Sequence, residues 1–94
     1  MTGTEIEKAF VEYLRTVYGI EAFKLRVDGR DGFPDRSVIV GARIFLIEFK
    51  SKNEELRPQQ RRLHELLGVE GTPVFIGRDF EESLQAFNDW MSEE

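Results

Sequence analysis

The chain has 94 residues, of which 40% are hydrophobic and 33% charged, and its formal net charge is −5. This length fits one domain, residues 1–94, which buries roughly 60–65% of its unfolded surface in a single core. The absence of cysteine excludes disulfides, thiolate zinc sites and cysteine nucleophiles, and a single histidine excludes a multi-histidine metal site within one chain. No apolar run approaches the ~20 residues of a membrane span and no signal peptide is visible, so we expect a soluble, cytoplasmic protein.

The charge is unevenly distributed along the chain. The acidic total, taken alone, argues against a nucleic-acid partner. Residues 24–62, however, hold ten Lys/Arg and six Asp/Glu, a net charge of +4, whereas the two flanks together carry −9. A basic face on an acidic protein therefore remains possible.

The first predicted element is a helix. Thr4 and Glu7 have the spacing of a capping box, with Thr4 as N-cap, and we expect the helix to end at Gly19. Its apolar stripe has spacings of 4, 4 and 3 residues and consists of Ile6, Phe10, Leu14 and Val17.

Three strands are predicted next. Apolar residues alternate with basic ones over 23–27, which favours a strand with Phe23, Leu25 and Val27 on one side. A turn-rich loop covers 28–34. Strands over 37–40 and 43–49 follow, joined by Gly41-Ala42 as a two-residue turn, and the second of them is apolar on both faces, as at the centre of a sheet.

The remaining elements are a helix, a strand and a helix. Pro58 suits a helix start, with Leu63, Leu66 and Leu67 buried and Gly68 as cap. A short strand is expected over 73–76. The last helix begins at Asp79, and its predicted buried face consists of Phe80, Leu84, Phe87 and Met91. The order α-β-β-β-α-β-α indicates an α/β domain with a small mixed sheet flanked by helices.

The hairpin turn brings two carboxylates together. A type II′ turn at Gly41-Ala42 pairs residues whose numbers sum to 83, so that Asp35 faces Glu48 with Cβ atoms roughly 5 Å apart. Lys50 lies on the same face as Glu48 because side chains alternate along a strand. Like charges directly opposite each other destabilise a hairpin, which indicates that the two carboxylates are used together.

Asp35, Glu48 and Lys50 offer carboxylate oxygens and one ammonium, which limits the chemistry that they can perform. Two close carboxylates can share a proton or bind a divalent cation, and oxygen ligands without His or Cys suit Mg²⁺ or Mn²⁺. A lysine beside such a cation can hold a phosphate oxygen or orient an attacking water. The predicted reaction is metal-assisted hydrolysis of a phosphodiester.

These residues resemble a known nuclease signature. Pro34-Asp35 followed by Glu48-Phe49-Lys50 resembles the PD-(D/E)xK motif of the restriction-endonuclease-like superfamily. The surrounding Gly32-Phe33-Pro34-Asp35-Arg36 and the later Leu56-Arg57-Pro58-Gln59-Gln60 are similar to the VRR-NUC branch. The resemblance runs from the first helix to the fourth strand, and it points to the stand-alone type of phages and bacteria, which acts in a bacterial or phage-infected cell.

The resemblance implies a role for each matching residue. Asp35, Glu48 and the Phe49 carbonyl would bind Mg²⁺ or Mn²⁺, and Glu7 would complete the metal shell. Lys50 would position the attacking water and stabilise the developing charge, with Gln60 close to it. Cleavage would leave a 5′-phosphate and a 3′-hydroxyl. Stand-alone members resemble homodimers that cut branched DNA, including four-way (Holliday) junctions.

Several residues keep two interpretations. Glu7 is either a ligand or only the helix cap, and Gln60 is either functional or an ordinary polar helix residue. His64, one turn after Gln60, is expected to be solvated rather than a general base. Predicted phosphate contacts are Lys52, Arg57, Arg61 and Arg36, with Lys24, Arg26, Arg30 and Arg62 as weaker candidates. Phe87, Trp90 and Met91 are either core or, where exposed, a dimer interface.

The sequence leads to a metal-dependent DNA endonuclease with a preference for branched structures. The alternatives are a less selective nuclease acting on flaps or duplex ends, and a DNA-binding module that does not cut. The intact set of Asp35, Glu48 and Lys50 favours an enzyme.

Overall fold

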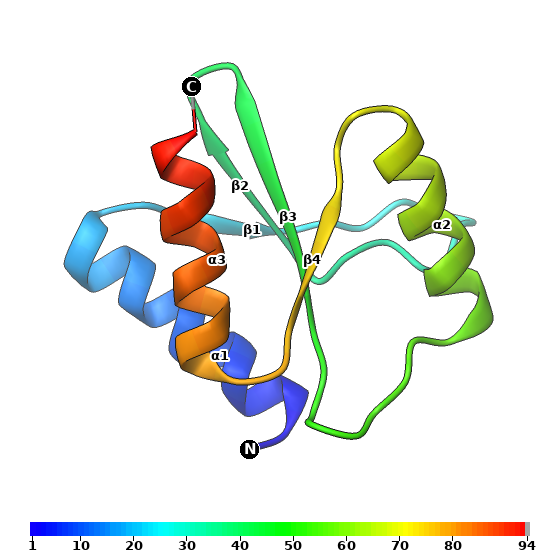
Figure 1. Cartoon of the computed structure of the whole chain (residues 1–94), viewed down its shortest axis with the longest axis horizontal. Helices are drawn as coiled ribbons and strands as arrows, with labels where there is room; N and C mark the ends of the chain where they lie inside the picture. Colours follow the sequence, from blue (N-terminus) through cyan, green and yellow to red (C-terminus); the bar gives the residue numbers. More distant parts are fainter. Residues whose placement is uncertain (94) are drawn as a thin grey trace.

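The structure is a computed structural model that describes residues 1–93. Its elements follow the predicted order (Figure 1). They are α1 (Gly3–Tyr13) continued by a π-helical turn (Leu14–Tyr18), β1 (Ala22–Lys24), β2 (Arg36–Val40), β3 (Arg43–Phe49), α2 (Pro58–Val69), β4 (Val74–Gly77) and α3 (Phe80–Ser92). The four strands form one sheet in the order β1-β2-β3-β4, antiparallel except for the parallel pair β3–β4.

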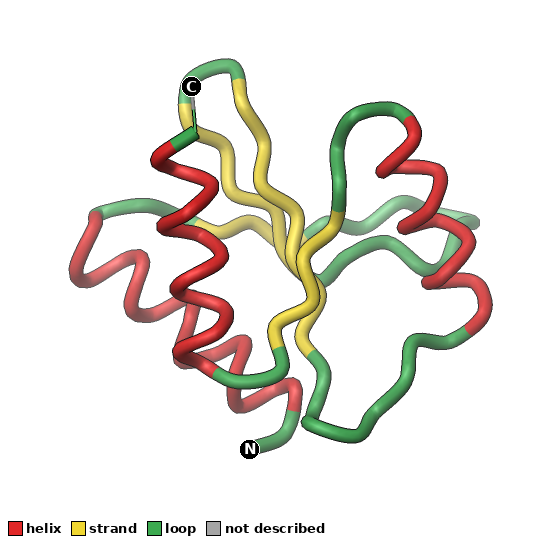
Figure 2. The backbone as a smooth tube through the Cα atoms, in the orientation of Figure 1, coloured by secondary structure: helices red, strands yellow, loops and turns green. Residues whose placement is uncertain are grey.

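The sheet separates two unlike layers. Figures 1 and 2 show α1 and α3 together on one side of the strands and α2 on the other. The core lies under α1 and α3, where Phe10 contacts the rings of Phe45, Phe49 and Phe87 at centroid distances of 6.5, 5.4 and 6.1 Å. On the side of α2, the buried residues include the apolar Leu46 and Leu63 beside the polar Glu48, Lys50 and Gln60.

The capping box of the first helix was predicted at the wrong pair of residues. The N-cap is Thr2, whose hydroxyl accepts from the Glu5 amide at 3.1 Å while the Glu5 carboxylate accepts from the Thr2 amide at 2.8 Å. Thr4 therefore lies inside the helix, and Glu7 has no role in capping. The predicted end is confirmed, since Gly19 takes a left-handed φ of 67° as the C-cap.

The first strand is shorter than predicted. It covers only Ala22–Lys24, with Ala22 buried and Phe23 52% exposed. Val27, predicted to belong to the strand, lies outside it, is 42% exposed and forms an isolated bridge with Arg30 at the tip of the following loop. At the edge of a sheet the outer face has no covering layer, so apolar alternation does not identify the buried side.

The hairpin was predicted correctly in its register. Arg36 pairs with Ile47 and Val40 with Arg43, which continues to Asp35 opposite Glu48. Gly41 has φ 62° and no non-glycine residue among the described ones has positive φ, so only the first turn position is left-handed, as in a type II′ turn.

The buried faces of the last two helices differ in part from the prediction. In α2, Leu63 is buried as expected, but Leu66 is 48% exposed, Gln60 takes a buried place, and the helix passes Gly68 to end at Val69. In α3, the buried residues are Ser83, Phe87 and Trp90, whereas Met91 is 39% exposed and Phe80 and Leu84 are half-buried. Phe87 and Trp90 thus belong to the core and are not available for a dimer interface.

The helices are also short. Within residues 1–93, none has both the length and the apolar character that crossing a bilayer requires.

Candidate active site

The predicted site residues line one polar cavity of about 410 Å³. It lies where β3 ends, between the N-terminus of α1 and the N-terminus of α2. Its wall comes from the start of α1, the residue before β2, the end of β3 with the loop after it, and the start of α2. The lining includes Glu7, Asp35, Glu48, Phe49, Lys50, Arg57 and Gln60. The structure therefore brings together the whole predicted catalytic set.

Asp35 and Glu48 are held close to each other on neighbouring strands. One oxygen of Asp35 accepts from the Phe49 amide at 2.8 Å, which fixes the carboxylate at the end of β3. Glu48 is 2% exposed, and its Oε1 is buried without a hydrogen-bond partner among the described residues. Burial first, and then the charge of Asp35, raises the pKa of Glu48 to about 7. Burial, with the charge of Glu7, also raises the pKa of Asp35.

Lys50 points into the same cavity and is buried. Its Nζ lies 3.7 Å from Glu48 Oε2 and 3.5 Å from Glu54 Oε2, and its own amide donates to the Gly77 carbonyl at 3.0 Å. A buried ammonium is stable only beside opposite charge, and here two carboxylates provide it. The ammonium is the positive group of the cavity nearest to Glu48.

Gln60 connects α2 to the acidic pair. Its Nε2 donates to Glu48 Oε2 at 3.1 Å, and its Oε1 accepts from the Arg57 amide at 2.9 Å, at the start of the helix. Both ends of the amide are thus used, which explains why a polar residue is 4% exposed at this position. Of the two neighbouring glutamines, Gln60 is the one directed at the site, as the family resemblance implied.

Glu7 lines the cavity, but its carboxylate is engaged elsewhere. Its Oε2 accepts from Arg36 Nε at 2.7 Å, and Arg36 also donates to the Ala22 carbonyl at 2.9 Å. In the part of the chain that the structure describes, no three Asp, Glu or His side chains are gathered closely enough to hold a metal ion. The carboxylates of the cavity that remain for a cation are those of Asp35 and Glu48, and Arg36 acts in the structure as the partner of Glu7.

His64 lies on the same side of α2 as Gln60. It is half-buried rather than solvated, and its Nε2 is buried without a hydrogen-bond partner in the described chain. Burial, and then the charge of Lys50, lowers its pKa, so the imidazole is neutral. That His64 does not act as a general base remains a prediction.

Two glycines permit the close packing around the site. A Cβ at Gly3 would lie 2.7 Å from the Phe49 carbonyl oxygen, so this residue lets the start of α1 approach the end of β3. Gly32 has φ 99°, and a Cβ there would lie 2.6 Å from the Gln59 carbonyl oxygen. The loop that carries Asp35 is therefore seated directly on the start of α2, beside Gln60.

Sequence reasoning missed Glu54, which contacts Lys50 from the loop after β3. Its other oxygen accepts from the Ser51 amide at 3.1 Å and the Ser51 hydroxyl at 3.3 Å. The spacing Ser51-x-x-Glu54 is that of a capping box and could have predicted the contact between Ser51 and Glu54. Arg78, also missed, binds the same loop from the end of β4, and no local pattern indicates it.

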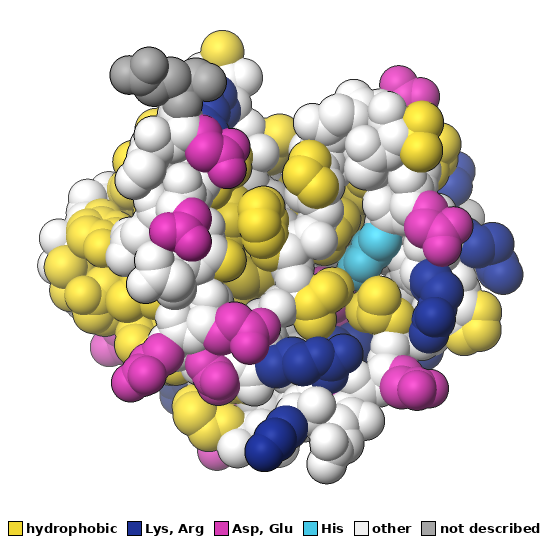
Figure 3. Space-filling model, in the orientation of Figure 1, with side chains coloured by type: hydrophobic (Ala, Val, Ile, Leu, Met, Phe, Trp, Pro, Cys, Tyr) yellow, Lys and Arg dark blue, Asp and Glu magenta, His cyan; other side chains and the backbone are white. Residues whose placement is uncertain are grey.

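The predicted phosphate contacts surround the cavity unequally. Lys52, Arg57 and Arg61 are exposed and take part in no ion pair that the described residues form, whereas Arg36 is half-buried against Glu7. Arg57 also borders a second polar hollow of about 670 Å³, formed by the loop that bears Arg26 and Arg30. In Figure 3, acidic side chains are densest around the start of α3, while much of the dark blue lies around α2 and below it.

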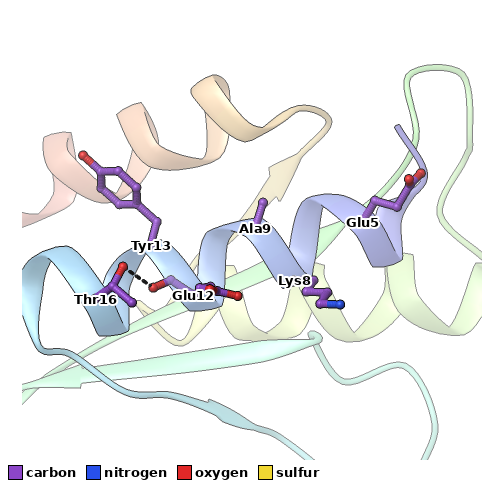
Figure 4. Close-up of a pocket in the computed structure, with 6 residues that line it drawn as sticks. All are labelled: Glu5, Lys8, Ala9, Glu12, Tyr13 and Thr16. Atoms are coloured by element: carbon purple, nitrogen blue, oxygen red, sulfur yellow. Dashed lines mark hydrogen bonds between the residues drawn. The ribbon is translucent and has the colours of Figure 1, made fainter.

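Another hollow, of about 550 Å³, lies along α1 and has no catalytic character. Figure 4 shows that its side chains all come from one side of this helix, including Glu5, Lys8 and Glu12. Its one dashed contact is the bond of the Thr16 hydroxyl to the Glu12 carbonyl at 2.9 Å. Glu5 belongs to the capping box of Thr2, and Lys8 and Glu12 are exposed.

Two solved structures have the same fold over nearly the whole chain. One, named "VRR_NUC domain", is 28% identical, with a TM-score of 0.79 over 94% of this chain and 97% of that chain. Another, named "VRR_NUC domain protein", is 14% identical, with a TM-score of 0.78 over 94% of this chain and 86% of that chain. No family model and no curated protein matches the sequence. The chain thus has the fold of VRR_NUC domains, which confirms the predicted mixed sheet flanked by helices.

Proposed function

We propose that the chain is a VRR-NUC nuclease domain of the stand-alone type, a metal-dependent endonuclease that cuts branched DNA. The observation that carries this proposal is the cavity in which Asp35, Glu48, Lys50 and Gln60 meet, since sequence pattern alone selects the same four residues. The likeness to two VRR_NUC structures supports the same function.

The residues present fit a divalent cation. Glu48 Oε1 is a buried carboxylate oxygen without a donor among the described residues, and burial and mutual repulsion raise the pKa of both carboxylates. A cation between them would relieve both effects, and an all-oxygen set of Asp35, Glu48 and the Phe49 carbonyl suits Mg²⁺ or Mn²⁺. Glu7, whose Oε2 accepts from Arg36, would complete this set from α1. When bound, the ion supplies Lewis-acid polarisation of the phosphate and lowers the pKa of an attacking water.

The chain's own groups perform the rest of the reaction. The Lys50 ammonium holds a non-bridging phosphate oxygen and stabilises the negative charge that grows as the water oxygen bonds to phosphorus. The bond from phosphorus to the 3′-oxygen breaks and this oxygen takes a proton from solvent, while the attacking water releases one to solvent. The products are a 3′-hydroxyl and a 5′-phosphate. Gln60 holds the Glu48 carboxylate in place through its amide, so that the acidic pair keeps its geometry while charge develops.

DNA binding is assigned to the exposed arginines and lysines beside the cavity. Arg57 borders both the catalytic cavity and a second hollow, in which Arg26 and Arg30 stand beside Asp28 and Asp31. Lys52 and Arg61 are exposed and follow Lys50 and Gln60 closely in the sequence. Because each phosphate contact releases counterions, binding by an acidic protein that depends on such contacts weakens steeply with salt.

A homodimer completes the proposal. Resolution of a four-way junction requires two paired nicks, and two copies of the chain supply two active sites. Sedimentation of the protein at micromolar concentration tests the assembly directly: a mass of two chains supports it, and a mass of one chain contradicts junction resolution by a dimer.

The function is tested by cleavage of a labelled four-way junction, a flap and a matched linear duplex, each with Mn²⁺, Mg²⁺ or EDTA. We expect symmetric, metal-dependent nicks in the junction and none with Asp35→Ala. Equal cutting of all three substrates would instead indicate a less selective nuclease. No cutting by the folded protein, together with retained DNA binding, would indicate a module that binds without cleaving.

A further inference from the structure

The loop between β3 and α2, residues 51–57, begins immediately after Lys50 and carries Glu54. Loops of this kind are held by few contacts and move more than the strands they follow. Here the first half of the loop is bound by one side chain from a different part of the chain. Arg78 Nη1 donates to the carbonyl of Glu54 at 2.7 Å, of Ser51 at 2.9 Å and of Lys52 at 3.4 Å.

Arg78 follows the last residue of β4, and β4 is the parallel neighbour of β3. Phe49 pairs with Gly77 at the end of the two strands, and the Lys50 amide donates to the Gly77 carbonyl at 3.0 Å. The guanidinium is therefore anchored by the sheet next to the backbone of Lys50. All three bonds are donated by one terminal nitrogen, Nη1, which thus gathers three carbonyls of the loop at one point.

Inside the bound loop, Glu54 has a defined place. Its amide donates to the Ser51 carbonyl at 3.2 Å, and its Oε1 accepts from the Ser51 amide at 3.1 Å. This leaves Oε2 at 3.5 Å from Lys50 Nζ. Glu54 is thus the second carboxylate on the ammonium, and its position follows from the shape that Arg78 gives to the loop.

We propose that Arg78 and Glu54 form a clamp that positions the Lys50 ammonium for catalysis. Arg78 holds the loop, and the loop places the Glu54 carboxylate on the ammonium as a second partner beside Glu48. When Glu48 is engaged by a cation, Glu54 is the carboxylate that still fixes Lys50. Arg78 touches neither the acidic pair nor a reacting atom, so it is a positioning residue, as is Glu54. The catalytic consequence rests on the nuclease function proposed above.

The clamp is tested with Arg78→Ala and Glu54→Gln. Both are expected to lower kcat by on the order of 10- to 100-fold with KM for DNA nearly unchanged, because a misplaced catalytic group slows the step without weakening substrate binding. Arg78→Ala is also expected to speed amide hydrogen exchange at Ser51 and Glu54. Glu54→Gln keeps an acceptor for the Ser51 amide, so its exchange is expected to stay close to wild type.

A matched control is Arg43→Ala. Arg43 also binds backbone carbonyls, at 2.7 Å to Trp90 and 3.2 Å to Glu93, but at the other end of β3. It is expected to lower thermal stability and to leave kcat per folded molecule unchanged. Arg78→Lys, which keeps the charge but replaces the planar guanidinium with a flexible, strongly hydrated ammonium, is expected to recover only part of kcat.

The outcomes separate the clamp from the nuclease function. A wild-type kcat in folded Arg78→Ala, or a loss of kcat in Arg43→Ala as large as in Arg78→Ala, would overturn the clamp. Unchanged exchange at Ser51 in Arg78→Ala would do so even in the absence of any activity. If the wild-type protein cuts no DNA, the proposed function fails and with it the catalytic role, whereas the exchange data still decide whether Arg78 holds the loop.

Discussion

The two faces of strand β3 lie in different environments, one in the apolar core and the other in the polar cavity. Phe45, Ile47 and Phe49 point toward α1 and α3, where they are at most 4% exposed in an aromatic core. The alternate residues Glu48 and Lys50 are about as deeply buried on the other face, yet there they lie in a polar cavity. One face is satisfied by packing, while the other retains a buried carboxylate oxygen without a partner among the described residues.

This difference has an energetic meaning. Buried charge is unfavourable unless it is paired, and two neighbouring carboxylates repel each other. The packed core of α1, β3 and α3 supplies stability that tolerates this unfavourable site. The two faces should therefore respond to mutation in opposite ways: one in stability and the other in activity.

The largest expected effect is on activity from the polar face. Lys50→Ala or Asp35→Ala should reduce cleavage by at least about 10³-fold, since each removes a group from the transition-state environment. Circular dichroism and thermal melting should remain those of a folded protein, because neither side chain belongs to the apolar core. Full cleavage in either folded variant would remove these residues from the site.

A second effect concerns pH and Glu48. The carboxyl has a pKa of about 7 in the folded protein against an ordinary value of 4.5, so the folded state keeps the proton that the unfolded state has released. Below about pH 4.5 the free energy of unfolding contains this contribution in full. The contribution is lost as the pH rises from about 4.5 to about 7, and above about pH 7 Glu48 causes no further change. The metal-free protein should therefore melt at a lower temperature at about pH 8 than at about pH 5.

The variant Glu48→Gln isolates this group. The melting temperature of this variant should differ much less between about pH 5 and about pH 8 than that of the wild type, because an amide does not titrate. Mn²⁺ should raise the melting temperature of the wild type at about pH 8, by the equivalent of about 2.7 kcal/mol at one hundred times Kd, and should have little effect on the variant. A wild type that is insensitive to Mn²⁺ would contradict the two-carboxylate metal site.

The apolar face should show the reverse behaviour. Phe10→Leu removes the ring that contacts Phe45, Phe49 and Phe87, and it should lower the free energy of unfolding by about 1–2 kcal/mol. Urea denaturation measures this change. Cleavage per folded molecule should stay at the wild-type level, and a parallel loss of kcat would mean that the two faces are coupled.

The polar face was predicted well from the sequence because a short turn determines it. Gly41-Ala42 sets the pairing of β2 with β3, and alternation then places Glu48 and Lys50 on one side. Gln60 was implied by the family resemblance. Its contact with Glu48 joins two residues that are 12 positions apart, and the fold makes this contact without a local signal.

The start of α1 was predicted incorrectly because two capping boxes overlap. Thr2-x-x-Glu5 and Thr4-x-x-Glu7 both fit the pattern, and only tertiary contacts decide between them. Gly3 has to lie against the Phe49 carbonyl, and Glu7 finds Arg36 from β2. These contacts join segments far apart in the chain, which local patterns do not contain. The same reason explains why Arg78 was missed.

The smallest expected effect is on DNA affinity at the edge of the catalytic cavity. Arg57 is exposed at the border of two polar hollows, and no ion pair of the described residues includes it. If its guanidinium contacts one phosphate, Arg57→Ala should lower the slope of log K against log salt by about 0.9 and weaken binding several-fold at low salt. Fluorescence anisotropy with a junction at several salt concentrations measures the slope.

The control is Arg15→Ala. Arg15 is exposed and paired with Glu21, and we expect this variant to leave the slope unchanged. Equal slopes for wild type and Arg57→Ala would place the DNA backbone elsewhere, whereas a lower slope with an unchanged kcat would separate substrate binding from the chemistry that β3 supports.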